Sequence, residues 1–457
     1  MQAMTETDPP PAATLLLARQ LAPPAAGVGA LITDASDSHL LVVAPTGAGK
    51  GRSVLLPWLL SYPGCVIVVD PKGEAASVSA RYRAELGQQV CIVDPWQHSD
   101  AARQHALNPV QAMLRHSTDL GDDCMTLAEL IAGEAPASLQ DPFWRASALH
   151  LLTALLGWSW VRAQVSGRTG SDDGTLAAVW SLLHADDLPL TLATLLDRHG
   201  QHAALPAFVQ QGFVNFLRHE AERVRTSVRS EAVSLMRVFG SARVQRATAQ
   251  TTLPLDTLVA GGAASVYLVV PPDRLESHAA YLRIQLGALL GLMVRRPRRP
   301  RWPTLFIVDE LGHLGPVPQL RQAITLLRGY GVRVALFVQS LAQLKSLWPR
   351  DWETLLDNTG TWIHFGSTSL AAARQVADQL GDVSAETLLA LPPDQMALHR
   401  AGQPTVLAHK LDYLHDPLFA GRFDPNPMHA AETVPGHRSG LARSRVGAAA
   451  ALSSLGD

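Results

Sequence analysis

A glycine-rich segment between an apolar strand and an apolar helix constrains the fold of this chain more than any other feature. The apolar run 40–43 leads into segment 44–51, with the sequence Ala-Pro-Thr-Gly-Ala-Gly-Lys-Gly, and a largely apolar helical stretch follows. Glycines let successive backbone N–H groups turn toward one point, and the helix N-terminus adds a positive partial charge. Strand, loop and helix in this order predict a P-loop that binds the phosphates of ATP.

The residues of this loop are predicted to surround the nucleotide, with the Lys50 ammonium on the β and γ phosphates. The residues expected to bind nucleotide are Pro45, Thr46, Gly47, Ala48, Gly49, Lys50, Gly51, Arg52 and, beyond the loop, Asp70. The alternative is a glycine-rich turn with an exposed lysine, which fits the flanking strand and helix less well.

Two positions depart from the general P-loop pattern. Ala44 takes the place of the first glycine, and Gly51 takes the place of the Ser or Thr whose hydroxyl ligates Mg²⁺. The next hydroxyl belongs to Ser53, and acidic side chains can hold Mg²⁺ through its waters. We therefore expect ATP and Mg²⁺ as cofactors, with Ser53 and Asp309 as the residues that hold the metal.

Short apolar runs with helical stretches between them predict an α/β fold around a mainly parallel central sheet. The runs that predict buried strands are 40–43, 66–69, 90–93, 264–270, 304–308, 332–338 and 361–365. The strand pattern is absent from about 127 to 246, where Leu, Ala and Trp recur at helical spacing. The predicted organisation is a flexible lead-in, a nucleotide-binding domain in two parts around an all-α insertion, and a disordered tail, over residues 1–27, 28–164, 165–246, 247–425 and 426–457.

Composition limits the class of protein. The 457 residues are 47% hydrophobic and 17% charged, which is typical of a globular chain. The formal net charge of −2 argues against a protein that coats nucleic acid along its whole surface, but it allows a local basic channel. No run reaches the roughly 20 apolar residues of a membrane span, and the three cysteines form no metal-binding or disulfide pattern.

An acidic pair follows the apolar run 304–308. In a P-loop enzyme, Asp309 would orient the Mg²⁺ shell and Glu310 would act as general base on the attacking water. The next run ends at Gln339, which could position that water or contact the γ phosphate. Arg328, just before a glycine turn, is either a surface residue or an arginine finger that reaches the ATP of a neighbouring subunit. The residues predicted to carry catalysis are Lys50, Asp309, Glu310, Arg328 and Gln339.

Taken together, the motifs resemble one family, the type IV secretion coupling proteins, which are TraG/TraD-like conjugation ATPases. The resemblance covers about 40 to 422. Its segments are, in chain order, 44–51, Asp70-Pro71-Lys72-Gly73-Glu74, 107–109, 141–144, 308–315, Arg328-Gly329-Tyr330-Gly331, 339–344, Asn358 and Tyr413. A glycine after the P-loop lysine is common in that family, so Gly51 fits this resemblance better than the general pattern.

The resemblance implies a RecA-like sheet interrupted by an all-α domain, and a motor that hydrolyses ATP to drive relaxase-bound DNA or protein effectors into a secretion channel. It implies hexameric rings, with Arg328 as the arginine finger. The partners that it implies are DNA, expected to be single-stranded, together with the channel ATPases and inner-membrane components. The expected location is cytoplasmic and peripheral at the inner membrane.

One departure from the family pattern is the missing N-terminal pair of transmembrane helices. Either the chain is a soluble variant that reaches the membrane through a partner, or the reading frame is incomplete. Two other functions stay open: an FtsK- or HerA-like translocase of duplex DNA, and a nucleotide-dependent cargo adaptor with little turnover.

The strongest basic run has the sequence Arg-Arg-Pro-Arg-Arg-Pro-Arg at 295–301. It precedes the strand that ends at Asp309, so it is expected to lie in a loop. The run is interpreted either as a solvated loop or ring rim, or as a contact to DNA phosphate or acidic lipid.

Overall fold

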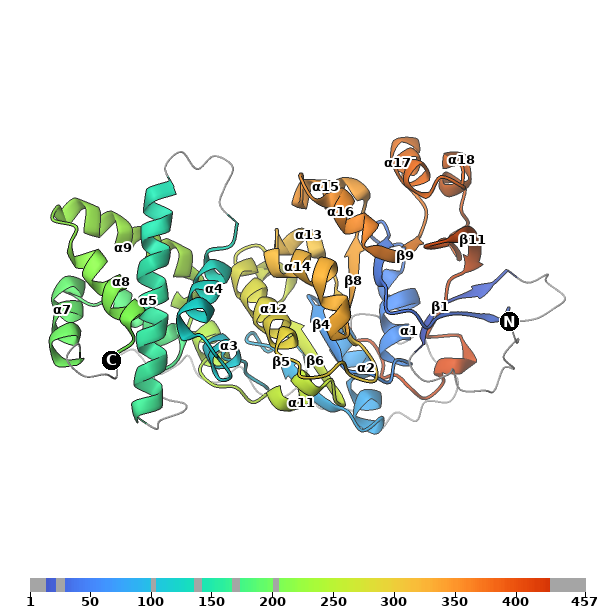
Figure 1. The fold of residues 1–457 in the computed structure, drawn as a ribbon. Coiled ribbons are helices and arrows are strands. Elements are labelled where there is room, and N and C mark those ends of the chain that lie inside the picture. Colours follow the sequence, from blue (N-terminus) through green and yellow to red (C-terminus); the bar gives the residue numbers. More distant parts are fainter. Residues whose placement is uncertain are drawn as a thin grey trace, which may run out of the picture.

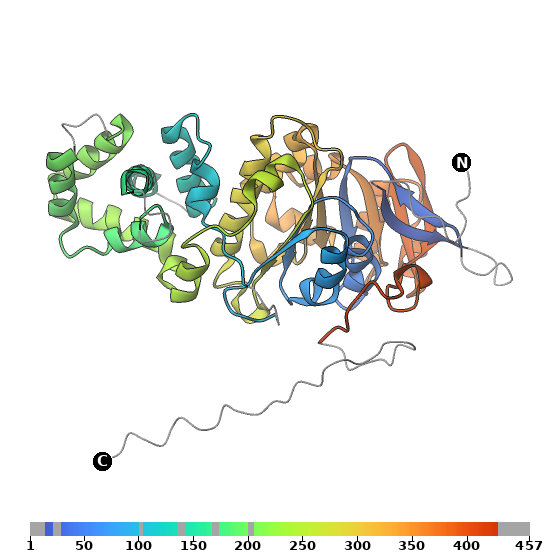
Figure 2. The ribbon, with the colours of Figure 1, turned by 90° about the horizontal axis from the view of Figure 1, so that it is seen from below.

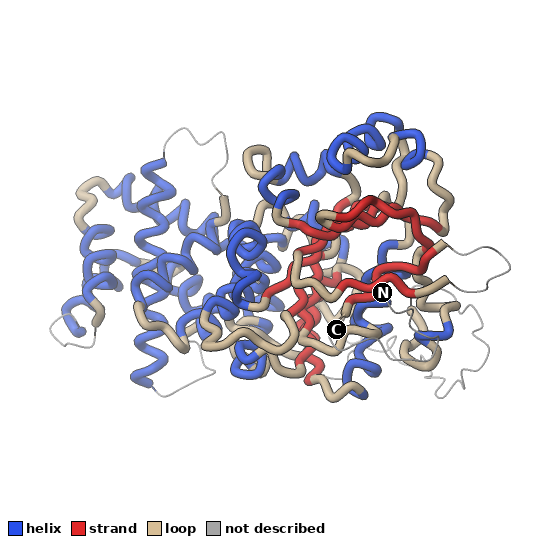
Figure 3. Tube along the Cα trace, turned by 45° about the vertical axis from the view of Figure 1, so that its right-hand side comes forward, coloured by secondary structure: helices blue, strands red, loops and turns tan. Residues whose placement is uncertain are grey.

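The computed structural model describes residues 14–21, 29–99, 104–134, 142–166, 173–199 and 205–427. Strands gather in one half of the molecule, and the other half consists of helices (Figures 1 and 3). The expected disordered tail lies outside the described residues from 428 onward, and so do residues 1–13 and 22–27 of the expected lead-in.

The described strands form one eleven-stranded sheet in the order β2-β1-β11-β10-β9-β3-β8-β7-β4-β6-β5. Pairing is parallel from β9 through β3, β8, β7, β4 and β6 to β5, and antiparallel from β2 to β9. The strand bounds are β1 Leu15–Gln20, β2 Leu31–Asp34, β3 His39–Val43, β4 Val66–Asp70, β5 Gln89–Val93, β6 Ala264–Val269, β7 Thr304–Val308, β8 Val332–Val338, β9 Thr359–His364, β10 Gln395–Arg400 and β11 Gln403–His409.

The seven strands of the parallel part are the seven apolar runs, so the predicted α/β sheet is confirmed with bounds that agree within two residues. Alternate residues of these strands enter two separate cores. Leu41 and Ile67 pack on one side of the sheet, whereas Leu40 and Val66 pack on the other. Because both faces are covered, the strands are apolar at nearly every position.

The antiparallel strands correct the expected lead-in. Residues 15–20 form β1 between β2 and β11, and the four residues 15–18 are fully buried. The Trp58 indole N–H donates to the Leu16 carbonyl at 2.7 Å. A run this short is a weak signal in sequence, and pairing with distant residues supplies its order.

Helices cover both faces of the sheet. The helices α1 Leu56–Leu59 and α2 Glu74–Glu85 pack on one face, whereas α12 Ala279–Val294 and α14 Pro318–Leu326 pack on the other. Further helices lie beside the ends of β7, β8 and β9 (Figure 1); their bounds are α13 Leu311–Leu314, α15 Leu341–Leu347, α16 Trp352–Asp357, α17 Leu370–Leu380 and α18 Ala385–Leu389.

The helical half lies at the β5 end of the sheet (Figure 2), and no described residue between β5 and β6 belongs to a strand. Its helices are α3 Pro109–Leu114, α4 Leu120–Ala132, α5 Pro142–Ser166, α6 Leu176–Leu183, α7 Leu188–His199, α8 Ala207–Leu217, α9 Glu222–Met236, α10 Ala242–Ala247 and α11 Leu255–Ala260. The boundary expected at 165 falls in the last turn of α5. Because α5 packs against α4, α6, α8 and α9, the whole of this helix belongs to the helical half. The helical half therefore begins earlier than expected.

Candidate nucleotide site

The predicted loop leaves the carboxyl end of β3 and enters a helical turn at Gly51–Leu55 that continues into α1. Gly47 and Gly49 have φ angles of 79° and 86°, which side chains rarely adopt. Lys50 has helical backbone angles and directly precedes the turn as its N-cap residue. The two left-handed glycines thus allow the loop to bend back on itself and to present its amide groups.

Lys50 joins the loop to the acidic end of β7. Its Nζ lies 2.6 Å from Glu310 Oε1 and 3.1 Å from Asp309 Oδ1. Burial alone would lower the pKa of Lys50, but the two carboxylates raise it above its ordinary value. The ammonium therefore stays charged at the place where the loop would receive phosphates.

Glu310 is fixed in an uncommon backbone conformation, with φ of 54°. Such strain is maintained only where the surroundings determine it, and it is frequent at functional sites. Burial raises the pKa of Glu310, but the hydrogen bond from Lys50 and that ammonium's charge bring the pKa below its ordinary value. The Gln339 amide donates to Glu310 Oε2 at 3.4 Å. The carboxylate is thus ionised and held from two sides.

Asp309 is nearly buried, and burial raises its pKa despite the Lys50 charge. Its Oδ1 has no hydrogen-bond partner of acceptable geometry, although the Lys50 ammonium is close. An unsatisfied buried oxygen at this point fits a water of a hydrated Mg²⁺.

The surroundings of Gly51 leave room for such an ion. A Cβ placed on Gly51 would meet only Glu74 Oε1, at 3.9 Å, and the Ser53 hydroxyl oxygen lies 3.8 Å from a Cβ placed on Gly49. No group of three or more metal-binding side chains occurs in the described part of the chain. The residues present fit a Mg²⁺ that keeps several waters and binds phosphate.

Asp70 ends β4, the strand next to β7, and it is buried. Its Oδ2 accepts the backbone N–H of Ala76, in the first turn of helix α2, at 2.8 Å. Burial raises the pKa of Asp70 to about 7, with smaller contributions from the nearby Asp309 and Glu74. The described contacts of Asp70 are thus with protein backbone, beside the site and not directed at the loop.

The Arg52 side chain binds the segment that follows β11. Its guanidinium donates to both carboxylate oxygens of Asp412 at 2.6 Å and lies 2.9 Å from His415 Nδ1. The segment after β11 therefore fastens onto the first helical turn after the loop. Neither Asp412 nor His415 carries a signal in the sequence that indicates this contact.

Lys410 is a second lysine at the loop, and the sequence did not single it out. Its Nζ donates to the Ala48 carbonyl at 3.2 Å and lies 3.9 Å from the Phe365 ring centre. Burial lowers the pKa of Lys410 to about 8. A third lysine of this region is Lys72, in the segment noted before α2, because its charge contributes to the lowered pKa of Glu310.

Arg328 lies at the amino ends of the parallel strands, opposite the ends that carry the loop. It precedes the start of β8, whereas the loop follows the end of β3, and these two strands run parallel in register. The separation is about the length of a seven-residue strand, roughly 20 Å. Arg328 therefore cannot reach the Lys50 site of its own chain.

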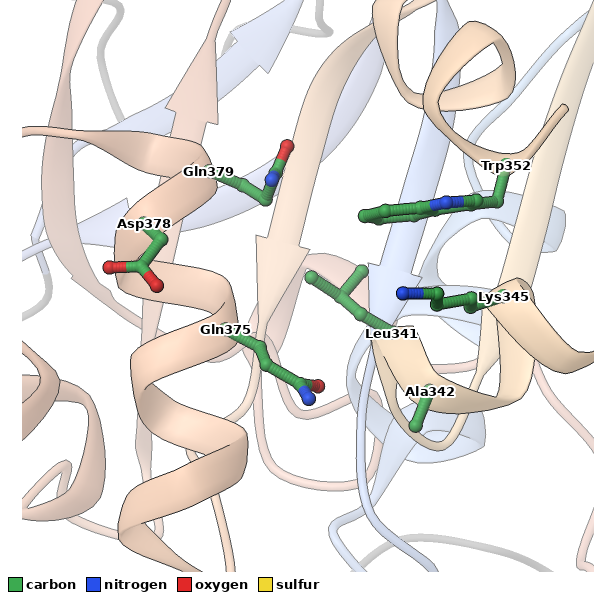
Figure 4. A pocket seen from close by; sticks show the side chains of 7 residues that line it. All are labelled: Leu341, Ala342, Lys345, Trp352, Gln375, Asp378 and Gln379. Atoms are coloured by element: carbon green, nitrogen blue, oxygen red, sulfur yellow. The ribbon is translucent and has the colours of Figure 1, made fainter. Parts of the chain in front are cut away.

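A pocket of about 240 Å³ lies between α15, α16 and α17 (Figure 4). The Lys345 ammonium lies 5.4 Å from the centre of the Trp352 ring on one wall, and Gln375, Asp378 and Gln379 line the facing helix. None of the predicted nucleotide residues lines this pocket, so it is separate from the loop.

The pattern of the family described as type IV secretory system conjugative DNA transfer matches residues 12–388. The chain belongs to this family. Two relatives come from Agrobacterium fabrum (strain C58): the conjugal transfer protein TraG, 27% identical over 353 residues, and protein VirD4, 25% identical over 374 residues.

The family match covers much of this chain but only part of its relatives. The alignments include 76% and 78% of this chain and 52% and 51% of TraG and VirD4, so the chain spans about half the length of the curated relatives it matches. Among the described residues, none of the helices has both the length and the apolar character that a membrane span requires.

Solved structures of similar fold include the plasmid coupling protein TrwB in complex with GDPNP, with a TM-score of 0.64 and 14% identity over 88% of this chain and 95% of that one. A TrwB complex with ADP and Mg²⁺ aligns with a TM-score of 0.63 and 14% identity, over 82% of this chain and 85% of that one. The RecA-like P-loop fold expected from the sequence is thereby confirmed.

Proposed function

We propose that this chain is an ATP-hydrolysing coupling protein that drives relaxase-bound DNA, or a protein substrate, into a type IV secretion channel. The observation that carries the ATPase part is the position of Lys50, whose ammonium joins the P-loop to Asp309 and Glu310. Family membership and the relatives named for conjugal transfer support the coupling part.

The proposed division of labour follows from the contacts. Backbone N–H groups of the loop from Thr46 to Gly51 and the Lys50 ammonium bind the phosphates. Glu310, ionised and fixed by Gln339, accepts the proton of the attacking water. Ser53 and Asp309 would hold Mg²⁺, which supplies positive charge against the phosphates when bound.

Arg328 acts on a neighbouring copy in this proposal, because it cannot reach its own site. An arginine supplied in trans stabilises the charge that develops on the transferred phosphoryl group. The arrangement requires a head-to-tail ring of copies, for which a hexamer is the proposed form. The proposed partners are DNA and the components of the secretion channel at the inner membrane.

The test is a steady-state ATPase assay with and without single-stranded DNA. We expect Lys50→Ala and Glu310→Gln to reduce turnover by at least about 100-fold. Glu310→Gln should still bind ATP, because the loop and Lys50 remain. Lys345→Ala is the matched control, a lysine outside the site, and should retain wild-type turnover. Unchanged hydrolysis in Lys50→Ala would refute the proposal, and tight ATP binding without turnover in the wild type would favour the cargo adaptor.

A further inference from the structure

Arg299 and Arg328, from different loops, both bind the carboxylate of Asp37. All three lie at the amino ends of the parallel strands, opposite the P-loop. Arg328 Nε and Nη2 lie 2.7 and 2.5 Å from Asp37 Oδ1, and Arg299 Nη2 binds the other oxygen, Oδ2. Asp37 precedes β3, Arg299 precedes β7 and Arg328 precedes β8. The carboxylate thus holds the two guanidiniums together, one on each oxygen.

The arginine-rich run builds this arrangement. Arg296 is buried, and its guanidinium donates to the carbonyls of Tyr330 and Gly331, both at 3.0 Å. Gly331 has a φ of 68°, and a Cβ placed there would meet Pro300 Cδ at 2.6 Å. The loop of Arg299 is therefore packed against the turn that carries Arg328. The backbone positions from which the two side chains extend are thus held relative to each other.

The remaining arginines of the run differ from this pair. Arg295 pairs with Asp123 at 2.9 Å, and Arg301 stacks on Trp302. Arg298 is exposed, and it lies one residue from Arg299. The run is therefore not a uniform strip of free charge for a DNA backbone, because most of its members bind the chain itself.

Arg299 and Arg328 are exposed enough to bind another anion in place of the Asp37 carboxylate. The side chains of Arg328, Arg299 and Asp37 are 57%, 49% and 26% exposed, and ion pairs so exposed contribute little to stability. Two guanidiniums at this spacing repel each other unless an anion lies between them. A phosphate offers the same paired oxygens as a carboxylate, with more negative charge, and arginine forks bind both.

We propose that Arg299 and Arg328 form a two-arginine site for the phosphates of a nucleotide bound by an adjacent copy of this chain, and that Asp37 occupies this site in the free subunit. The inference rests on the proposed function, and it adds Arg299 as a second residue supplied in trans. Asp37 then serves as the internal anion that a neighbour's nucleotide replaces.

The experiment compares Arg299→Ala with Arg298→Ala, its exposed neighbour. Turnover is measured over a range of protein concentrations, and nucleotide affinity is measured on dilute subunits with a fluorescent ATP analogue. We expect Arg299→Ala to lower maximal turnover at least ten-fold with unchanged nucleotide affinity, whereas Arg298→Ala stays within two-fold of wild type. Equal turnover of the two variants would overturn the inference.

Mixing separates action in trans from a local structural role. In an equal mixture of Arg299→Ala and Lys50→Ala subunits, some sites combine an intact loop with an intact neighbouring arginine. Random assembly predicts about a quarter of wild-type turnover from the mixture, more than either impaired variant shows alone. Activity that stays at the level of the separate variants would overturn the inference. A wild type without any ATPase activity would refute the proposed function itself, so the two failures are distinguishable.

Discussion

Replacement of Asp70 by Asn tests whether burial keeps this carboxyl protonated near neutral pH. An ordinary Asp has a pKa of 3.8, and burial raises the pKa of Asp70 to about 7. Between these values the folded chain binds a proton that the unfolded chain has released, so the free energy of unfolding falls as pH rises from about 4 to about 7. Each pKa unit corresponds to about 1.4 kcal/mol, so the cost at pH 8 is about 4 kcal/mol.

Asn cannot ionise, but its amide oxygen can still accept the N–H of Ala76. We therefore expect Asp70→Asn to raise the free energy of unfolding by about 4 kcal/mol at pH 8 and by less than half as much at pH 5. The assay is urea denaturation followed by circular dichroism at both values of pH. The exposed Asp357→Asn serves as control. Parallel pH profiles of wild type and Asp70→Asn would refute the reasoning, since the carboxyl would then have an ordinary pKa.

Two further predictions concern the loop and the arginine turn. Lys410→Met should weaken binding of a fluorescent ATP analogue about five-fold at pH 7. Because burial lowers the pKa of Lys410 to about 8, the affinity of the wild type should fall between pH 7 and 9, whereas the variant should show no such fall. A wild-type affinity that does not change with pH would contradict this prediction. Gly331→Ala should lower the free energy of unfolding by about 1–3 kcal/mol, since φ is 68° and the new Cβ would meet Pro300. The control is Gly329→Ala, whose Cβ meets nothing within 4 Å, and it should lower the melting temperature much less. Equal melting temperatures of the two variants would count against the argument.

The parallel part of the sheet was predictable because its residues are apolar on both faces. Val66, Ile67 and Val68 are each nearly fully buried, which leaves a continuous apolar run in the sequence. Strand β11 carries no such signal, since residues 403, 404 and 406 are exposed and only pairing with β10 and β1 orders it. The antiparallel edge was therefore missed.

The site shows the same division. Lys50, Asp309 and Glu310 were identifiable because a glycine loop and an acidic strand end are local patterns. Lys410 was not, because its contact with Ala48 spans most of the chain and depends on how β11 ends. Arg52 was assigned to the nucleotide from its place beside Lys50, whereas only the fold shows that Asp412 binds its guanidinium.

Strand β8 has a consequence for how the subunits of a ring would communicate. Its residues 335–338 pair with β3 on one side and its residues 332–336 pair with β7 on the other, so neighbouring strands support it along its length. Arg328 precedes its first residue and Gln339 follows its last. In the proposed ring, the Arg328 end of β8 would face a neighbour's nucleotide, while the Gln339 end contacts Glu310 at the candidate nucleotide site of its own chain. In such a ring, the β8 strand of each subunit would connect one nucleotide site to the next. The order of ATP hydrolysis around the ring would then depend on a short connection inside each subunit.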